Sequence, residues 1–537
     1  NGIAEQQSRR SSSYSNENVL TYIKKIGQHS LNVMVGSSLL YEENKTGSMT
    51  ARDFISDVYG YNNLDAGAQW DKPNTGRSKS TLLSGFGRIN YVLMDKYLFT
   101  VTGRADGSSK FGANNKWAFF PSFAAAWRIN QEKFMKNIDW ISNLKIRGSW
   151  GVTGNQNIPA YSSPEKMNTY TYPIGGVTSV GIGAGNMPNP DLKWETTAIT
   201  DIGIDLGVFN NRINFTADYY YKKTTDLLWN ISVPLTTGFG TVLKNIGSLQ
   251  NKGLELSLSA DVLTGPFKWN TMLNWSTNKN KVLEIPGYIP TQQGTISGHL
   301  KVNGSWLEPG LPVGVWNLLK TNGVMRTEKE WQDAARVADS NFDKIGDMSF
   351  VDKNGDGKIS FGEDRQIVGD PNPDFTYGFQ TRLEWKNLSL SASFTGVYGN
   401  DILNTNIRYE QTPSRQAGNL RKDAYYNAWT PENRSNLYPS STSNVKGVVY
   451  DRYVEDGSYL RCSDITLNYI LPKAWMTKIG FQNTSIFASV KNAFVITNYS
   501  GYDPEVNSFA FDGLRRGIDM NAFPNMRSFV FGLNVTF

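Results

Sequence analysis

The sequence predicts an all-β protein, a transmembrane antiparallel β-barrel of about 15 strands with long loops on one side of the membrane. Three observations lead to this fold class. The composition is rich in aromatic residues although it is polar on average. Many segments alternate apolar with polar residues, and the connections between these segments alternate in length.

Composition excludes a helical membrane protein. Among 537 residues there are 26 Tyr, 27 Phe and 15 Trp, yet the mean hydropathy is −0.42. No apolar run approaches the roughly 18 residues that a membrane-spanning helix needs. A secreted all-β protein and a barrel with lipid-facing and lumen-facing positions both remain, so the residue pattern must decide.

Charge and cysteine content narrow the function classes. The formal net charge is +6, but Lys and Arg are scattered among acidic residues, which argues against a nucleic-acid surface. Cys462 is the single cysteine, so no internal disulfide can form, and its alternating context indicates a packed or lumen-facing thiol. Residues 1–5 carry no basic n-region and apolar h-region, so we expect any export signal to have been removed or to lie upstream.

The C-terminal segment shows the strand pattern most clearly. A period of two with one apolar face predicts a strand over 527–537, and its apolar positions are Phe529, Phe531, Leu533, Val535 and Phe537. A terminal Phe on such a strand resembles the end of outer-membrane barrels. The same pattern predicts further strands near 14–27, 29–42, 80–95, 97–109, 117–130, 143–155, 195–209, 212–228, 249–263, 267–281, 374–387, 388–399, 458–471 and 484–496.

The connections alternate between short and long along the chain. Gly27-Gln28, Asp95-Lys96, Asn210-Asn211 and Lys386-Asn387 are tight turns, whereas the long loops are expected at 43–79, 156–194, 229–248, 282–373, 400–457 and 497–526. Transmembrane barrels have tight periplasmic turns and long external loops. A periplasmic C-terminus would place every long loop outside the cell. Because closed bacterial barrels have an even strand number, the odd number here leads us to expect further strands before Asn1.

Several sequence blocks resemble one family, the SusC/RagA type of TonB-dependent outer-membrane transporter from Bacteroidota. The blocks are Tyr97-Leu98-Phe99-Thr100, Arg104 to Gly112, Gly151 to Gln156, Asn189 to Glu195, Asn211 to Asn214 with Asp218-Tyr219-Tyr220, Asp370 to Phe375, and Gly501 to Glu505. The resemblance covers nearly the whole chain in the family's order. It identifies residues 1–537 as the later part of such a barrel.

The resemblance implies a 22-strand barrel with a plug and a TonB-contacting segment in the missing N-terminal part. It also implies TonB-dependent import of oligosaccharides or peptides, with a SusD-like surface lipoprotein as partner, and pairs of transporter and lipoprotein that can dimerise. The surrounding lipids would be those of the outer membrane. No coupling residue can be assigned to this chain, and the substrate-binding residues are unknown.

The strongest local motif lies inside the expected external loop 282–373. Residues 352–363 match the calcium-loop pattern D-x-[DN]-x-[DN]-G-x₅-E of EF-hands at each required position. The expected oxygen ligands are Asp352, Asn354, Asp356, the carbonyl of Lys358, Ser360 through a water, and Glu363. Gly357 would allow the sharp turn and Ile359 would be an apolar anchor. The alternative is an Asx- and Gly-rich turn without an ion.

We expect this calcium to be structural, not regulatory. A sensing EF-hand needs a helix on each side of its loop. The sequence predicts one helix nearby, from Thr327 to Ala338, with Thr327 and Glu330 as a capping box, and this helix lies well upstream. The ion would therefore brace the loop.

Catalysis has little support. His29 and His299 are the only histidines, and neither stands in a zinc motif or near a candidate nucleophile. The expected loops also contain aromatic residues that could stack on sugars or pack the loops together: Trp70, Trp229, Trp306, Trp316, Tyr409, Tyr425, Tyr426, Trp429, Tyr438 and Tyr502. Two other readings remain, a surface-exposed all-β binding or adhesion protein and, less favoured, an outer-membrane enzyme.

Overall fold

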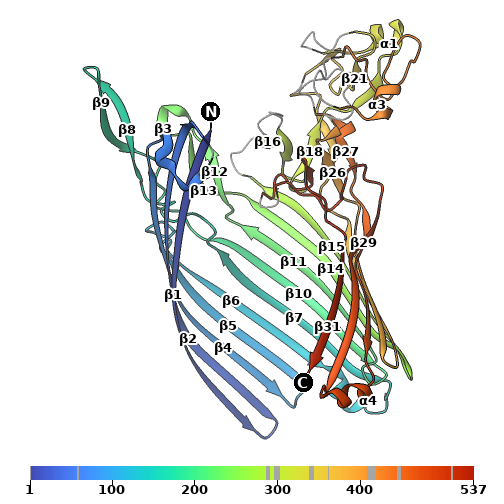
Figure 1. The fold of residues 1–537 in the computed structure, drawn as a ribbon. Helices are drawn as coiled ribbons and strands as arrows, with labels where there is room; N and C mark the ends of the chain where they lie inside the picture. The colour runs from blue at the N-terminus through green and yellow to red at the C-terminus, as the bar shows by residue number, and fades with distance from the viewer. Residues whose placement is uncertain are drawn as a thin grey trace. The chain divides into compact units, whose positions relative to one another are not determined.

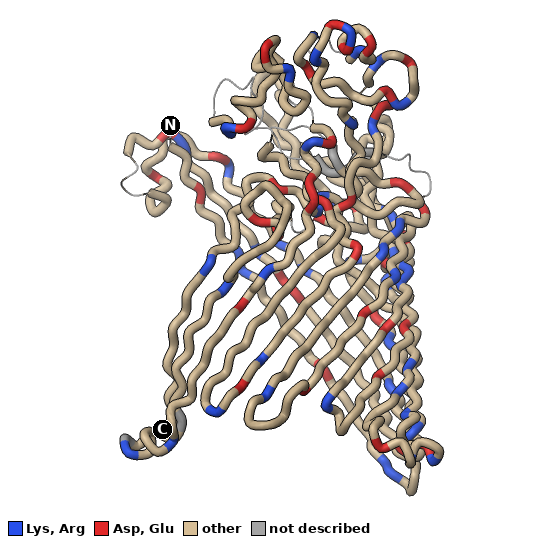
Figure 2. The backbone as a smooth tube through the Cα atoms, turned by 90° about the vertical axis from the view of Figure 1, so that its right-hand side faces the viewer, with Lys and Arg blue, Asp and Glu red and all other residues tan. Residues whose placement is uncertain are grey.

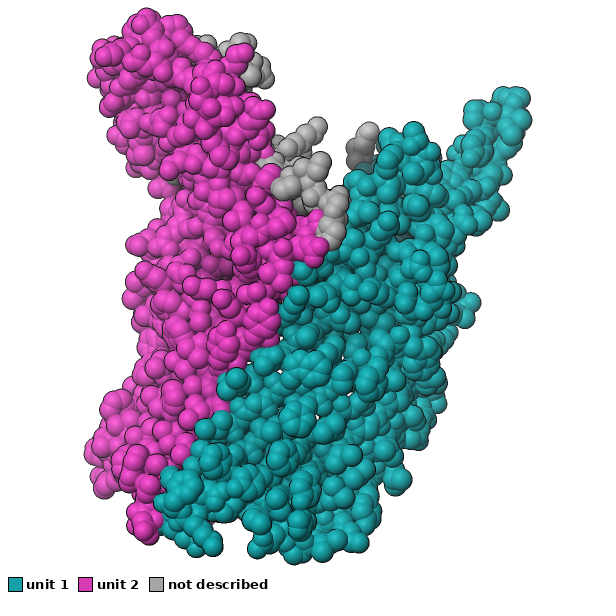
Figure 3. Space-filling model, turned by 180° about the vertical axis from the view of Figure 1, so that it is seen from behind, with its two compact units in different colours: residues 1–136, 145–202, 222–248 teal, residues 137–144, 203–221, 249–537 magenta. Residues whose placement is uncertain are grey.

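A computed structural model describes residues 2–56, 58, 60–285, 291–295, 303–337, 344–360, 362–407, 419–443, 449–509 and 512–537. The chain forms two compact units (Figure 3). Unit 1 comprises residues 1–136, 145–202 and 222–248, and unit 2 comprises 137–144, 203–221 and 249–537.

One large antiparallel sheet contains all the strands that the sequence predicts (Figure 1). Neighbours in the sheet follow the order of the sequence, as expected for an up-and-down barrel wall. The strands are β1 (Ile3–Ile26), β2 (His29–Phe54), β4 (Asn74–Leu93), β5 (Tyr97–Ser108), β6 (Trp117–Arg128), β7 (Ile141–Asn155), β10 (Glu195–Val208), β11 (Ile213–Thr225), β14 (Ser248–Thr264), β15 (Phe267–Glu284), β24 (Phe375–Trp385), β25 (Leu388–Tyr398), β28 (Tyr459–Ile470), β29 (Asn483–Thr497) and β31 (Ser528–Thr536). The short strand β3 (Gly67–Trp70) pairs with β2.

The registers give the sheet one apolar face and one polar face. In unit 1, Val33 stands opposite Ile89, and Ile89 stands opposite Val101. In unit 2, Leu390 pairs with Leu467, and Ala488 pairs with Phe531. We call this the membrane face. Because side chains alternate along a strand, the residues between them form the opposite, polar face.

Small residues on the strands make room for aromatic rings. The Trp117 ring lies over Gly107 on the membrane face of unit 1, where an added Cβ would come 2.6 Å from Trp117 Cε2. On the polar face of unit 2, Phe487 occupies the corresponding space over its partner Gly532. Glycine is needed at these positions because any larger side chain would displace a ring.

The predicted loop 43–79 is wrong at both ends. The strand β2 extends to Phe54 and β4 begins at Asn74, while β1 begins at Ile3, well before the predicted residue 14. The polar residues of these extensions show no apolar alternation, but antiparallel backbone pairing continues from Ile3–Arg52 to Ile26–His29. Backbone hydrogen bonds can extend a hairpin beyond the apolar belt, where the sequence pattern gives no signal.

The other strands belong to small sheets in the connections. In unit 1, β8 (Met167–Ile174) pairs with β9 (Val177–Ala184), and β12 (Leu228–Ser232) pairs with β13 (Thr241–Asn245). Unit 2 contains β16 (Thr291–Thr295), β17 (Asn303–Leu307), β18 (Val315–Leu318) and β23 (Gln366–Gly369) in one sheet, with two pairs, β19 (Thr321–Val324) with β21 (Met348–Phe350) and β20 (Arg336–Val337) with β22 (Lys358–Ile359). A further sheet has the order β27 (Val454–Asp456), β26 (Asp401–Asn404) and β30 (Ile518–Asp519).

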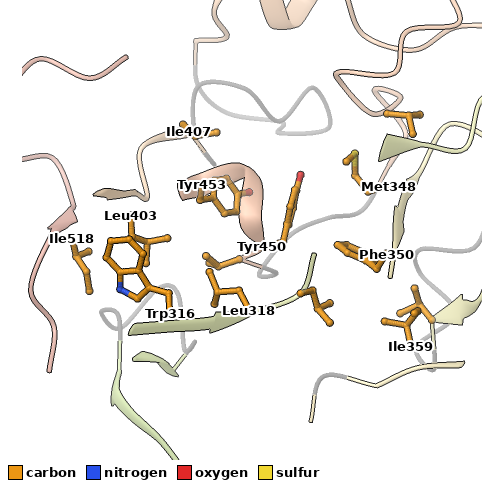
Figure 4. Close-up of a cluster of buried hydrophobic side chains, with 14 residues drawn as sticks. Trp316, Leu318, Met348, Phe350, Ile359, Leu403, Ile407, Tyr450, Tyr453 and Ile518 are labelled. Atoms are coloured by element: carbon orange, nitrogen blue, oxygen red, sulfur yellow. The ribbon is translucent and has the colours of Figure 1, made fainter. Parts of the chain in front are cut away.

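The long connections of unit 2 share one hydrophobic core (Figure 4). Trp316, Leu403 and Ile518 come from three different connections, and none of the three is solvent-exposed. The parallel pairing of Leu403 with Ile518 joins two of these connections directly. Full burial of each such side chain contributes about 1.5–3 kcal/mol, so these loops form a folded subdomain.

The loops of unit 1 contain a second, smaller core. Phe111 and Trp194 are both buried, with ring centroids 4.7 Å apart, and Trp194 Nε1 donates to the Lys116 carbonyl at 3.1 Å. Gly112 lies against the backbone of Pro190, where a Cβ would be only 2.0 Å from the Pro190 carbonyl oxygen. Two of the blocks that carry the family resemblance, Arg104 to Gly112 and Asn189 to Glu195, therefore pack against each other.

Helices are few and short. Among the described residues they are α1 (Glu328–Asp333), α3 (Lys422–Tyr426) and α4 (Lys473–Met476), with 3₁₀ turns that include η3 (Ile129–Gln131) and η4 (Lys133–Met135). In the part of the chain that the structure describes, none of the helices has the length and apolar character required to span a bilayer.

The helix predicted over 327–338 is shorter than expected. The Thr327 side chain caps it by accepting from Glu330 N at 3.2 Å, as predicted. The Glu330 carboxylate accepts from Arg326 N at 2.7 Å, and a backbone hydrogen bond from Thr327 also acts on it, so Glu330 reaches back to the cap as a capping box requires. The helix ends at Asp333 because Arg336 and Val337 pair with Lys358 and Ile359 as strands.

Candidate functional site

A hollow of about 570 Å³ opens on the polar face of unit 2. The strands β11, β14, β15, β24, β25 and β28 line it, with Asp218, Glu255, Asn274, Ser276, Thr376, Thr395 and Tyr459 among the lining residues. The space beside Gly396 is filled by the Tyr377 ring, but the hollow stays open beside Gly378, where an added Cβ would meet only the Phe394 carbonyl oxygen at 3.8 Å. It therefore offers carboxylate, amide and hydroxyl groups on one wall.

The rim of this hollow is held by strong polar contacts. The Tyr459 hydroxyl donates to Glu505 Oε1 at 2.6 Å. Next along β28, Arg461 pairs with Asp503, and both side chains are almost fully buried at 6% and 5% exposure. Arg461 Nε also lies 3.0 Å from Glu505 Oε2. These contacts fix the 497–526 connection to β28.

The hollow is suited to binding polar molecules. Carboxylates accept hydrogen bonds from sugar hydroxyls and from ammonium or guanidinium groups, and hydroxyls and amides can both donate and accept. The sequence pattern assigned no binding role to these residues, although Asp218 stands in one of the blocks that carry the family resemblance. The alternation of β14 and β15 could have placed Glu255 and Asn274 on the polar face, but only the register of the strands brings them together.

The predicted calcium loop is a tight turn organised by hydrogen bonds from backbone N–H groups to side-chain carboxylates. Asp352 Oδ1 accepts from Gly355 N and Asp352 Oδ2 from Gly357 N, each at 2.7 Å. Gly355 and Gly357 have φ angles of +76° and +79°. Asp356 Oδ1 accepts from Lys358 N at 2.8 Å, so two carboxylates are oriented by the loop backbone. Positive φ at these positions favours glycine.

The last predicted ligand reaches back across the loop. Asn354 Nδ2 donates to Glu363 Oε2 at 3.3 Å, and Glu363 N donates to the Ser360 hydroxyl oxygen at 3.0 Å. The Asn354 amide oxygen points the other way and accepts from Asp356 N at 3.1 Å. The oxygen chemistry of these side chains suits calcium.

The loop is tied to the subdomain core. The Ile359 side chain is fully buried, and Arg336 N donates to the Gly357 carbonyl at 3.0 Å. Within the described ranges, no three His, Cys, Asp or Glu side chains are gathered as a preformed metal cluster. Asp352, Asp356 and Glu363 are among the described residues and do not form such a cluster, so the site of Asp352, Asn354, Asp356, Lys358, Ser360 and Glu363 stays a prediction.

The loop aromatics divide into packed and exposed residues. Trp316 and Tyr438 are buried, whereas Trp70, Tyr425, Tyr426 and Tyr502 are exposed. Tyr425 and Tyr426 form an edge-to-face pair with ring centroids 5.3 Å apart. Tyr409 lies outside the described residues. Trp229, Trp306 and Trp429 are half-buried, so the exposed aromatic residues offer the most ring surface for stacking on a ligand.

The histidine and the cysteine that the structure describes, His29 and Cys462, both make packing or hydrogen-bond contacts. His29 Nδ1 is 2.7 Å from the Tyr91 hydroxyl on the neighbouring strand, and His299 lies outside the described residues. Cys462 is fully buried beside a β-bulge, opposite Phe394 and Phe494. The thiol is therefore packed, which is one of the two placements expected. Lys, Arg, Asp and Glu are interspersed along the chain (Figure 2).

A family model and curated relatives match this chain. The family model described as TonB dependent receptor-like, beta-barrel matches residues 3–359. TonB-dependent receptor P3 of Formosa agariphila is 36% identical over 100% of this chain and 53% of its own length. TonB-dependent receptor SusC of Bacteroides thetaiotaomicron is 31% identical over 96% of this chain and 49% of its own length. The chain thus spans about half the length of these relatives.

A solved structure supports the same fold. A structure of the RagAB peptide transporter superimposes with a TM-score of 0.84 at 23% identity, and the match covers 99% of this chain and 56% of that one. The two-faced antiparallel sheet, the matching family model and the SusC relative agree with one another. The chain belongs to the TonB-dependent receptor β-barrel family and is a SusC/RagA-type barrel segment of the bacterial outer membrane.

Proposed function

We propose that the protein containing this chain imports oligosaccharides or peptides across the outer membrane in a TonB-dependent manner. The observation that carries the proposal is the hollow on the polar face of unit 2, which places Asp218, Glu255 and Asn274 on the side away from the lipid. A wall used only to anchor a protein has no need of such a recess. The resemblance to a SusC relative supports the same reading.

The chemistry of the hollow accommodates both substrate classes. Hydroxyl and amide groups such as those of Thr376 and Asn274 suit sugars and peptide backbones, while Asp218 and Glu255 suit basic peptide side chains. The similar RagAB structure is described as a peptide transporter. We propose no catalytic role for this chain, and the family match is to receptors.

The proposed partners follow from the family. A SusD-like surface lipoprotein would bind at the long-loop end, and the TonB complex would act through the N-terminal part of the protein. Two transporter and lipoprotein pairs could form a dimer. The folded subdomain around Trp316 supports the lipoprotein proposal, because it provides a rigid surface on the connections expected outside the cell.

The competing proposal is a surface-exposed binding or adhesion protein without transport. The exposed pair Tyr425 and Tyr426 favours it, since exposed aromatic rings can bind a surface ligand without any passage through the barrel. A transporter and an adhesion protein would both bind a ligand at the cell surface. Only internalisation of the ligand distinguishes the two functions.

Co-purification tests the proposal. The full-length protein would be extracted in detergent from its native membrane, and bound proteins and small molecules identified by mass spectrometry. A co-purified lipoprotein together with a bound oligosaccharide or peptide is expected. Recovery of the protein from the aqueous fraction without detergent, or alone with no ligand under several growth substrates, would contradict the proposal.

We also propose that Asp352, Asn354, Asp356, Lys358, Ser360 and Glu363 hold a structural Ca²⁺. The three carboxylates repel one another when no cation is present, and the ion would offset that repulsion while its oxygen ligands complete the coordination shell. The neighbouring β20–β22 pairing would transmit the order of the loop to the subdomain. The role is bracing, since α1 is short and the loop lacks flanking EF-hand helices.

A further inference from the structure

Three cations stand in one row on the membrane face of unit 1. Arg10 of β1 is the register partner of Lys45 of β2, and Lys45 is the partner of Arg77 of β4. Residues directly opposite in neighbouring strands point to the same face. Lys79 is two residues from Arg77 on that face, and all four side chains are exposed. We call Arg10, Lys45, Arg77 and Lys79 the basic row.

The basic row lies just beyond the apolar belt of the same strands. Four residues nearer the short-turn end, Tyr14 and Tyr41 are partners, and the next row on that face contains Leu39 and Leu83. Tyrosines at the edge of an apolar band are typical of the membrane interface. Four residues span about 14 Å along a strand, which is about 10 Å along the membrane normal at the usual tilt.

The charges in this row are only partly balanced by protein groups. Like charges directly opposite in a sheet destabilise it. Glu43 is the carboxylate nearest the row: it contacts Arg77, and Lys45 Nζ lies 3.9 Å from it. Arg10 makes no ion pair with any described residue. Three cations in register with one carboxylate leave an anion-binding surface.

We propose that the basic row binds the phosphate-bearing headgroup of a glycolipid in the outer leaflet. The position above the tyrosines is the headgroup layer, provided that the long-loop end faces outward. Arg groups bind phosphate through paired N–H donors, and Lys adds a point charge. The apolar rows below, including Leu39 and Leu83, would contact the acyl chains. A soluble anion would have no use for this adjoining apolar surface.

Lipid retention tests the proposal on the full-length protein. The protein would be placed in phosphatidylcholine nanodiscs with a small fraction of diphosphoryl lipid A, and retained lipid phosphate measured after dilution. The triple variant Arg10→Gln, Lys45→Gln and Arg77→Gln should bind this lipid about tenfold more weakly, since each cation near a lipid surface contributes to attraction. Lipid A without phosphates should be retained equally by both proteins.

A matched control removes the same charge from the opposite face of the same strands. Arg9, Lys25 and Arg88 occupy polar-face positions of β1 and β4, so their change to Gln should leave lipid retention unaltered. The basic-row variant should fold normally in detergent, because it removes mutual repulsion, and its melting temperature confirms this.

Three results would overturn the proposal. The first is equal retention of phosphorylated lipid A by wild type and the basic-row variant. The second is an equal loss of lipid retention in the control variant, in which Arg9, Lys25 and Arg88 are changed to Gln. The third is binding of inorganic phosphate alone as tightly as the lipid, which would assign the row to a soluble anion.

Discussion

Lys96 Nζ lies 2.6 Å from Glu132 Oε2, and this ion pair links the β4–β5 turn to the connection between β6 and β7. Glu132 also accepts from the Tyr97 hydroxyl at 2.7 Å and from Trp127 Nε1 at 3.2 Å. One carboxylate therefore joins three neighbouring strand ends.

These contacts make the short-turn end sensitive to acid. The hydrogen bond from Lys96, followed by that from Tyr97, lowers the pKa of Glu132 to about 2. A carboxyl with a lowered pKa stabilises the folded state above its unfolded pKa, and this contribution is lost as the pH falls toward 2. We expect the protection of the amide hydrogens in residues 129–136, measured against the intrinsic exchange rate at each pH, to fall between pH about 4.5 and 2. Glu132→Gln should exchange fast throughout; an unchanged pH profile in this variant would contradict the assignment.

The buried Arg461–Asp503 pair predicts a large stability effect. Arg461→Gln leaves the Asp503 carboxylate buried without its cation, which costs about 3–5 kcal/mol for a buried pair. Hydrogen exchange should rise in the 497–526 connection while the strands stay protected. Arg461→Met combined with Asp503→Leu should recover most of the loss. A single variant as stable as wild type would show that the pair is not important.

Close packing of Phe487 over Gly532 predicts a specific rescue. Ala at position 532 would place its Cβ 2.2 Å from Phe487 Cε1, and such overpacking costs about 1–3 kcal/mol. Folded barrels migrate differently from unfolded ones in electrophoresis. In the Gly532→Ala variant, the heating temperature at which the protein loses the mobility of its folded form should fall. Adding Phe487→Ala should restore it in part, whereas Phe487→Ala alone should not raise it. If the temperature change of the double variant equals the sum of the changes in the two single variants, the two residues act independently.

The proposed calcium site predicts ion-dependent protection. Chelation should expose new protease cleavage near Asp352, with the β-sheet circular dichroism signal unchanged, because the ion braces a loop outside the sheet. Asp356→Ala should lose the calcium measured by metal analysis and should show the same cleavage without chelator. Lys353→Ala is a matched control, since its side chain is not a predicted ligand. Full calcium occupancy in Asp356→Ala would contradict the site.

The sequence alone was sufficient to predict the strands that form the large sheet. The strands carry a period-2 pattern that reports directly which face meets lipid, so Phe531 and Leu390 could be placed without a structure. The same rule failed for β1 and β2 beyond the apolar belt, where no lipid selects apolar residues. Local helix propensity also overestimated the length of the helix after Thr327. Val337 pairs with Ile359 of a strand farther along the chain, and local propensity does not report such a pairing.

The subdomain and the polar hollow could not be predicted in this way. Trp316, Leu403 and Ile518 pack together although they stand in three connections far apart in sequence, and no periodicity links them. Asp218, Glu255 and Asn274 share a hollow only through the registers of their strands. The calcium loop is the opposite case, since all its predicted ligands lie within twelve consecutive residues.

Energy-dependent uptake tests the proposed import most directly. Labelled oligosaccharides and peptides would be given to wild-type cells, to cells lacking the full-length gene, and to cells with inactivated TonB. Import by this barrel predicts that internalised label is lost in both altered strains, while surface-bound label persists when only TonB is inactive. Unchanged internalisation in the strain lacking the gene, across the substrates that support growth, would contradict it.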